Sequence, residues 1–147
     1  MRLLLALLLA LPLAAQRPLH VNADKDGLAL YGYDVVAYHT LGAPTVGRAD
    51  ITATWEGATW RFATADHRDR FLKDPARYAP QYGGFCAYGV AGDYKVKVEP
   101  DAWRIVAGKL YLNYDRRVQE RWSRDIAGYI AKAEANWPAL RPRARRD

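Results

Sequence analysis

Two short segments of the chain have the pattern of a β-hairpin, and they constrain the fold more than any other feature. In residues 51–62, two arms of alternating apolar and polar residues are joined by Glu56 and Gly57. In residues 103–112, two similar arms are joined by Ala107 and Gly108. Alternation around a two-residue connection that contains glycine is typical of antiparallel hairpins. The sequence therefore predicts two small antiparallel β-hairpins.

The segments around the hairpins favour short helices. Asp34 and Thr64 are residue types that cap helix N-termini, so we expect helices in residues 34–39 and 64–73. Three further helices are predicted in residues 74–78, 116–123 and 125–136, and the Trp137-Pro138 pair is expected to end the last one. A chain of 147 residues that is 50% apolar suits one globular domain. We predict one α+β domain over residues 27–140, made of small antiparallel hairpins packed with short helices.

The N-terminus has the features of a secretory signal peptide. Arg2 precedes an unbroken apolar run, and the run ends in small residues near Ala15. The run is shorter than the ~20 apolar residues that cross a bilayer as a permanent helix. We expect residues 1–15 to be removed and residues 16–26 to form a polar lead-in. The mature protein would be extracytoplasmic, periplasmic or secreted, and would have no membrane span.

The formal net charge of +6 comes mostly from the two ends of the chain. Loss of Arg2 with the signal peptide leaves +5. The segment 141–147 carries four arginines and one aspartate, so the rest of the chain has a net charge near +2. We expect this segment to be a disordered, solvated basic tail. A nucleic-acid interface would need a basic stripe on the domain itself, and the sequence shows none.

Several motifs together resemble the YHS domain family, in its secreted or periplasmic branch. The first group comprises Trp55-Glu-Gly-Ala-Thr-Trp60-Arg-Phe62, then Thr64, Phe71, Asp74-Pro75 and Tyr78. The second group comprises Gly32-Tyr-Asp34-x-Val-Ala-Tyr38, Ala79-Pro-Gln-Tyr-Gly-Gly-Phe-Cys-Ala-Tyr88, Gly108-Lys-Leu-Tyr-Leu-Asn113 and Asn136-Trp-Pro138. The resemblance covers roughly residues 27–140. It implies a small binding module associated with metals such as copper.

The same resemblance implies where metal ligands would lie. In metal-binding members the ligands are three cysteines, and their positions fall on Ala37, Ala63 and His67 of this chain. Two of the three thiolates are therefore absent, while His67 keeps a side chain that can bind a metal ion.

A metal site built from the residues present would use Cys86 and His67, with His39 and Asp34 as further candidates. A thiolate with imidazoles suits copper or zinc. Each residue also has an ordinary interpretation. Cys86, the only cysteine, would be a buried apolar residue, the histidines would be solvated, and Asp34 would be a helix cap. His20, in the lead-in, is expected to be uninvolved.

The Gly-rich aromatic segment around Cys86 supports an alternative function without metal. Its residues would form a binding surface for a small ligand or a protein partner: Tyr82, Gly83, Gly84, Phe85 and Tyr88. The same aromatic residues would otherwise belong to the core. An enzyme with a thiol nucleophile is a third hypothesis, and it needs a base near Cys86. The sequence contains no recognisable Ser-His-Asp set or phosphate-binding loop.

Overall fold

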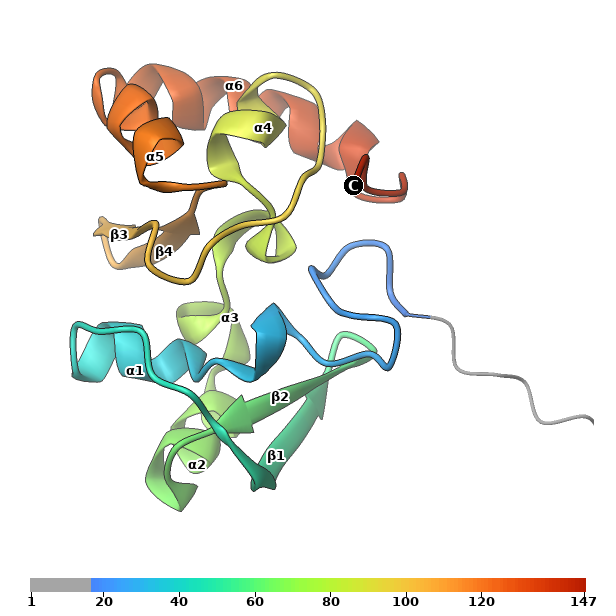
Figure 1. Cartoon of the computed structure of the whole chain (residues 1–147), viewed down its shortest axis with the longest axis vertical. Helices are drawn as coiled ribbons and strands as arrows, with labels where there is room; N and C mark the ends of the chain where they lie inside the picture. The colour runs from blue at the N-terminus through green and yellow to red at the C-terminus, as the bar shows by residue number, and fades with distance from the viewer. Residues whose placement is uncertain (1–16) are drawn as a thin grey trace, which may run out of the picture.

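The computed structural model describes residues 17–147 (Figure 1). The predicted signal peptide, residues 1–15, lies outside the described residues. Among the described helices, none is long and apolar enough to cross a membrane. The elements follow in the order η1 Leu30–Gly32, α1 Val35–Thr40, β1 Arg48–Trp55, β2 Ala58–Phe62, α2 Ala65–Lys73, α3 Pro75–Tyr78, η2 Gln81–Gly84, α4 Ala87–Ala91, β3 Trp103–Val106, β4 Lys109–Leu112, α5 Arg116–Ser123 and α6 Ile126–Leu140.

Both predicted hairpins are present, so the expected α+β class is confirmed. Strand β1 pairs antiparallel with β2, and β3 pairs antiparallel with β4. The connecting residues Glu56 and Gly57 have φ values of 52° and 73°, and Ala107 and Gly108 have values of 50° and 76°. Two successive residues with positive φ form the turn that matches the right-handed twist of paired strands.

The predicted helix starts are also confirmed, because the capping side chains form the expected bonds. The Asp34 carboxylate accepts from the backbone N–H groups of Val36 and Ala37 at the start of α1. Thr64 caps α2 in the same way, and Asp115 and Asp125 cap α5 and α6. Helix α6 continues through Pro138 to Leu140, beyond its predicted end. A proline so close to a helix end removes one hydrogen bond and leaves the last turn in place.

The side chains form two buried clusters. One is centred on the lower elements of Figure 1 and extends upward to Cys86, and the other lies among the upper elements. The lower cluster contains Trp60, Phe62 and Phe71, from the first hairpin and α2. The upper cluster contains side chains of η2, α4, α5 and α6. Strand β4 belongs to both. Leu110 and Leu112 enter the lower cluster and Tyr111 enters the upper one, because successive side chains of a strand point to opposite faces.

The lead-in is part of the folded domain. Val21, Asn22 and Ala23 are buried, although the composition of the segment is polar. The Asn22 N–H donates to the Gly83 carbonyl at 2.8 Å, and a Cβ atom on Gly83 would collide with the His20 carbonyl. The two chain segments approach closely because Gly83 has no side chain.

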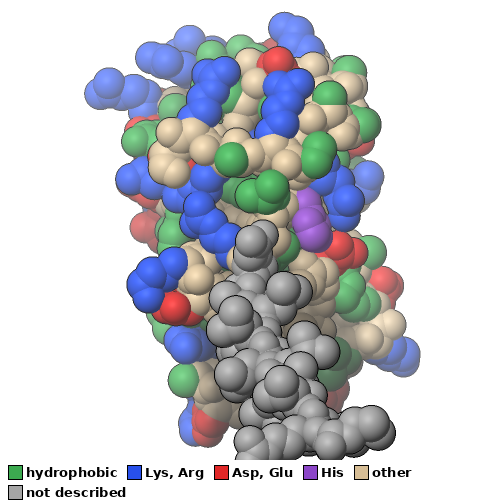
Figure 2. Space-filling model, turned by 90° about the vertical axis from the view of Figure 1, so that its right-hand side faces the viewer, with side chains coloured by type: hydrophobic (Ala, Val, Ile, Leu, Met, Phe, Trp, Pro, Cys, Tyr) green, Lys and Arg blue, Asp and Glu red, His purple; other side chains and the backbone are tan. Residues whose placement is uncertain are grey.

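The C-terminal segment differs from the predicted disordered tail. The Arg145 guanidinium donates to the Asn22 side chain at 3.0 Å, and the Asp147 carboxylate accepts from the Lys97 N–H at 2.8 Å. A backbone bond of 2.9 Å joins Arg146 to Lys95. The tail therefore packs against residues 95–97 instead of extending into solvent. Figure 2 shows the face that carries the C-terminal segment, and basic side chains are prominent in its upper half.

Candidate functional site

The Asp34 carboxylate is fully buried and is the most heavily hydrogen-bonded acidic group of the lower part. Its Oδ2 lies 2.6 Å from Nδ1 of His67 and accepts from the Ala63 N–H at 2.8 Å. Its Oδ1 accepts from two N–H groups of α1, including that of Ala37 at 3.1 Å. Ala37, Ala63 and His67, the three positions where the resemblance places cysteines, therefore all contact the Asp34 carboxylate.

The second nitrogen of His67 is also engaged. His67 Nε2 lies 3.0 Å from the hydroxyl of Thr40, at the end of α1. A carboxylate, an imidazole and a hydroxyl in this order also occur in nucleophilic triads. Here, however, the hydroxyl lies 3.2 Å from the Val36 carbonyl, which is a usual partner for a threonine in a helix. We interpret these contacts as a structural link between α1 and the start of α2.

His39 has separate surroundings. Its ring packs edge-on against the Tyr78 ring, with the two centroids 5.4 Å apart. Burial lowers the pKa of His39, although a hydrogen bond to the Tyr78 backbone opposes the shift. Nε2 of His39 is buried and has no hydrogen-bond partner among residues 17–147.

The structure does not collect the four proposed metal ligands at one place. Asp34 and His67 are in contact in the lower part, whereas Cys86 immediately precedes α4 in the upper part of Figure 1. Within residues 17–147 there is no group of three or more His, Cys, Asp or Glu side chains that could hold a metal ion. Asp34 and His67 form a pair whose polar atoms already have protein partners.

Most of the Gly-rich aromatic segment is interior. Tyr82 is buried, and its hydroxyl donates to the Glu134 carboxylate at 3.1 Å. Phe85 is buried with the Lys95 ammonium 5.0 Å from its ring centre. Gly84 is buried, whereas Gly83 is half-buried against the lead-in and lines a second pocket beside Trp55 and Trp137. Of the five residues proposed as a binding surface, only Tyr88 lines the pocket described next.

Cys86 is a free thiol with an exposed fraction of 1%. Its sulfur accepts from the N–H groups of Tyr114 at 3.2 Å and Gly89 at 3.4 Å, and its S–H points to Oδ1 of Asn113 at 3.6 Å. Burial raises the pKa of the thiol, and the surrounding N–H groups oppose this only in part. The thiol is therefore protonated near neutral pH, which is the reverse of an activated nucleophile.

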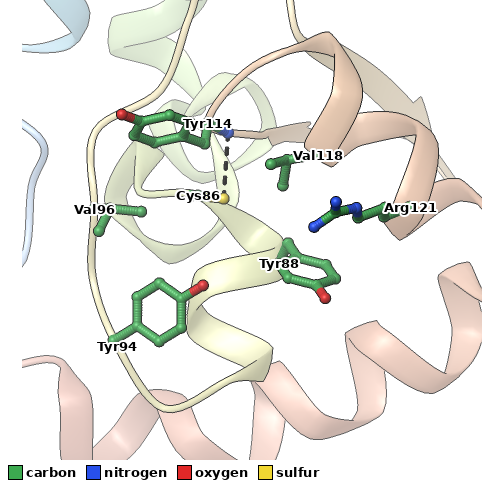
Figure 3. Close-up of a pocket in the computed structure, with 7 residues that line it drawn as sticks. All are labelled: Cys86, Tyr88, Tyr94, Val96, Tyr114, Val118 and Arg121. Carbon is green, nitrogen blue, oxygen red and sulfur yellow. Dashed lines mark hydrogen bonds between the residues drawn. The ribbon is translucent and has the colours of Figure 1, made fainter.

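A pocket of about 280 Å³ lies beside the Cys86 sulfur (Figure 3). Its walls come from three segments: the start of α4, the stretch that follows α4, and the segment from Tyr114 through α5. The lining residues are Cys86, Tyr88, Tyr94, Val96, Tyr114, Val118 and Arg121. Figure 3 shows Tyr94 and Arg121 on opposite sides of Cys86. The site thus combines three phenol rings, two valines, one thiol and one cation.

Sequence reasoning missed most of this pocket, although part of its signal is visible in hindsight. Val118 and Arg121 have the i, i+3 spacing that puts side chains on one side of a helix, and Tyr114 comes directly before the Asp115 cap of that helix. Tyr94 and Val96 alternate, so they can share one face of an extended segment. Neither pattern shows that the two segments meet at Cys86, because that contact depends on the tertiary fold.

Comparison with protein-family models, with curated proteins and with solved structures finds no match to this chain.

Proposed function

We propose that this protein is a binding module for a small molecule, which enters the pocket beside Cys86. The observation that carries the proposal is the composition of the pocket walls. Phenol rings and valines offer apolar contact, while Arg121 and the tyrosine hydroxyls offer polar contact. Small-molecule sites are typically concave, mainly apolar, and equipped with a few polar groups that fix orientation.

The pocket chemistry favours binding over nucleophilic catalysis. Its lining contains no histidine, aspartate or glutamate that could take a proton from Cys86. Burial raises the pKa of the thiol, so little thiolate forms near neutral pH. The sulfur instead accepts backbone hydrogen bonds and helps to hold α4 against the residues before α5.

The experiment is a screen of small aromatic and aliphatic fragments by ligand-observed NMR, with a variant that fills the pocket. Val118→Trp places an indole where fragments would bind, and the exposed residue Tyr31 provides the control variant Tyr31→Ala. We expect fragments that bind the wild type and the control to lose binding to Val118→Trp. Equal binding to all three proteins would refute the proposal.

Metal binding stays a second proposal, motivated by the family resemblance and by His67. The experiment is titration of the purified mature protein with Cu(I), Cu(II) and Zn²⁺, compared with Cys86→Ala and His67→Ala. A functional site would give affinity much tighter than millimolar and would lose it in at least one variant. Millimolar affinity, or affinity unchanged in both variants, would exclude the proposed ligands.

We further propose that the protein acts outside the cytoplasm. The support is the signal-like composition of residues 1–15. Expression of the full chain, followed by mass spectrometry of the exported product, tests this. Export with cleavage near Ala15 is expected, and an uncleaved cytoplasmic product would contradict the proposal.

A further inference from the structure

The pocket beside Cys86 contains one charged side chain, and that side chain is a cation. Arg121 lies on α5, and Figure 3 shows its guanidinium turned toward the space between Tyr88 and Val118. Within residues 17–147 the Arg121 side chain forms no hydrogen bond or ion pair. Its planar set of N–H donors therefore remains available at the pocket, in the geometry that matches a carboxylate.

Two of the tyrosine rings that line the pocket also have a cation beside them. The Lys97 ammonium lies 5.8 Å from the centre of the Tyr114 ring, and the Arg146 guanidinium lies 4.9 Å from the centre of the Tyr94 ring. The acidic group on the adjoining turn is Asp115. It accepts from the Val118 N–H at 2.7 Å as the cap of α5 and does not line the pocket. The Asp115 charge does reach the Cys86 sulfur, where it adds to burial in raising the pKa of the thiol. Arg121, Lys97 and Arg146 are three cations beside the same pocket, so the charges named here favour an anion.

The shape and the walls restrict the rest of the ligand. Tyr88, Tyr94 and Tyr114 contribute flat aromatic surfaces, and Val96 and Val118 contribute aliphatic surface. Aromatic side chains favour offset or edge-to-face contact with another ring. A volume of about 280 Å³ lies just below the range of about 300–1,000 Å³ for ligand pockets, so it suits a single ring with short substituents.

We infer that the ligand is a small aromatic carboxylate, whose acid group pairs with Arg121 and whose ring packs against the tyrosines. This inference rests on the proposed binding function and narrows it to one chemical class. A carboxylate paired with a guanidinium forms charge-assisted hydrogen bonds, which are about twice as strong as neutral ones. A neutral isostere in the same position loses that contribution while keeping its ring contacts.

The test uses benzoate, its neutral isostere benzamide, and the non-aromatic acid cyclohexanecarboxylate. Each is titrated into ¹⁵N-labelled protein, and the amide shifts locate the site. The variant Arg121→Gln removes the cation. Arg116→Gln is the matched control, because Arg116 is exposed on the same helix and does not line the pocket.

We expect benzoate to shift amide signals of residues 86–96 and 114–121, and to bind about tenfold more weakly to Arg121→Gln than to wild type or Arg116→Gln. Benzamide should bind weakly and be indifferent to Arg121→Gln, and cyclohexanecarboxylate should bind more weakly than benzoate. Equal affinities of benzoate and benzamide, or no effect of Arg121→Gln, would overturn the inference and leave pocket binding intact. No pocket shifts with any of the three would overturn the inference. If every compound of the fragment screen also fails, the proposed function fails with it.

Discussion

Asp34 forms a buried hydrogen-bond network at the positions where the sequence resemblance suggests metal ligands. Its carboxylate is buried and accepts from three backbone N–H groups, and it contacts the His67 ring at 2.6 Å. The positions that the YHS resemblance assigns to metal ligands therefore surround a carboxylate whose lone pairs have protein partners. This arrangement stabilises the junction of α1, β2 and α2 and does not require a metal ion.

We predict that Asp34→Ala lowers the free energy of unfolding by about 3 kcal/mol, because it leaves buried N–H groups without an acceptor. The measurement is urea denaturation. The control is Asp50→Ala, which breaks the exposed ion pair between Asp50 and Arg48. The control should leave the urea midpoint nearly unchanged, because an exposed ion pair is screened by solvent. A cost for Asp34→Ala as small as that of the control would show that the network is not structural.

At the scale of elements, the contact between η2 and the lead-in depends on Gly83. Its φ is +63°, and a Cβ atom there would collide with the His20 carbonyl. Gly27 also has a positive φ, of +82°, but a Cβ atom there would meet nothing within 4 Å. Substitution of Gly27 therefore measures the cost of the backbone conformation alone, whereas substitution of Gly83 adds the cost of the close contact.

We predict that Gly83→Ala destabilises the protein by at least ~2 kcal/mol more than Gly27→Ala, because only at Gly83 would the added Cβ atom collide with the backbone of another segment. Thermal and urea denaturation of both variants measure the difference. Equal effects of the two substitutions would mean that the lead-in does not pack on η2 as described.

The elements that could be predicted from the sequence are those whose signals are local. The two hairpins follow from alternation and two-residue turns, and the helix starts follow from capping residues such as Asp34 and Thr64. Helix α4 was missed because the segment after Cys86 is rich in glycine, and its cap is a cysteine sulfur that accepts from the Gly89 N–H. A sulfur cap has no established sequence signal, so the sequence does not predict this helix.

The candidate site was less predictable, because it is formed by contacts between segments that are distant in the sequence. Cys86 and Tyr88 were singled out from their own segment, but Tyr94, Val118 and Arg121 reach them through tertiary packing. Conversely, Tyr82 and Phe85 looked suited to a binding surface because aromatic residues serve both cores and sites. Only the packing of the lead-in and α6 over them decides that they are interior.

At the scale of the whole molecule, Lys95 joins the two ends of the described chain. Its exposed fraction is 1%, and its ammonium donates to the carbonyls of Leu19 at 2.8 Å and Arg141 at 3.1 Å. The rings of Phe85 and Trp137 lie 5.0 and 5.7 Å away. Burial lowers the pKa of Lys95 to about 8 from a usual value near 10.5.

We predict that Lys95 makes stability rise with pH above about 8. Between this pKa and 10.5 the unfolded chain binds more protons than the folded one, so loss of protons favours folding. Below pH 8 both forms are protonated and the trend disappears. The measurement is urea denaturation of wild type and Lys95→Met at pH 7.5 and pH 9.5. The free energy of unfolding of the wild type, relative to that of Lys95→Met, should be higher at pH 9.5 than at pH 7.5. A difference independent of pH would contradict a buried, depressed lysine.

The most direct test of the account is a crystal structure of the protein soaked with a cocktail of small aromatic fragments. The account predicts fragment density in the pocket bounded by Cys86, Tyr88 and Arg121, with any carboxylate directed to the Arg121 guanidinium. A second, smaller pocket of about 140 Å³ lies beside Trp55 and Trp137 and provides an internal comparison. Density only in that pocket, or none beside Cys86, would contradict the claim that the Cys86 pocket is the binding site.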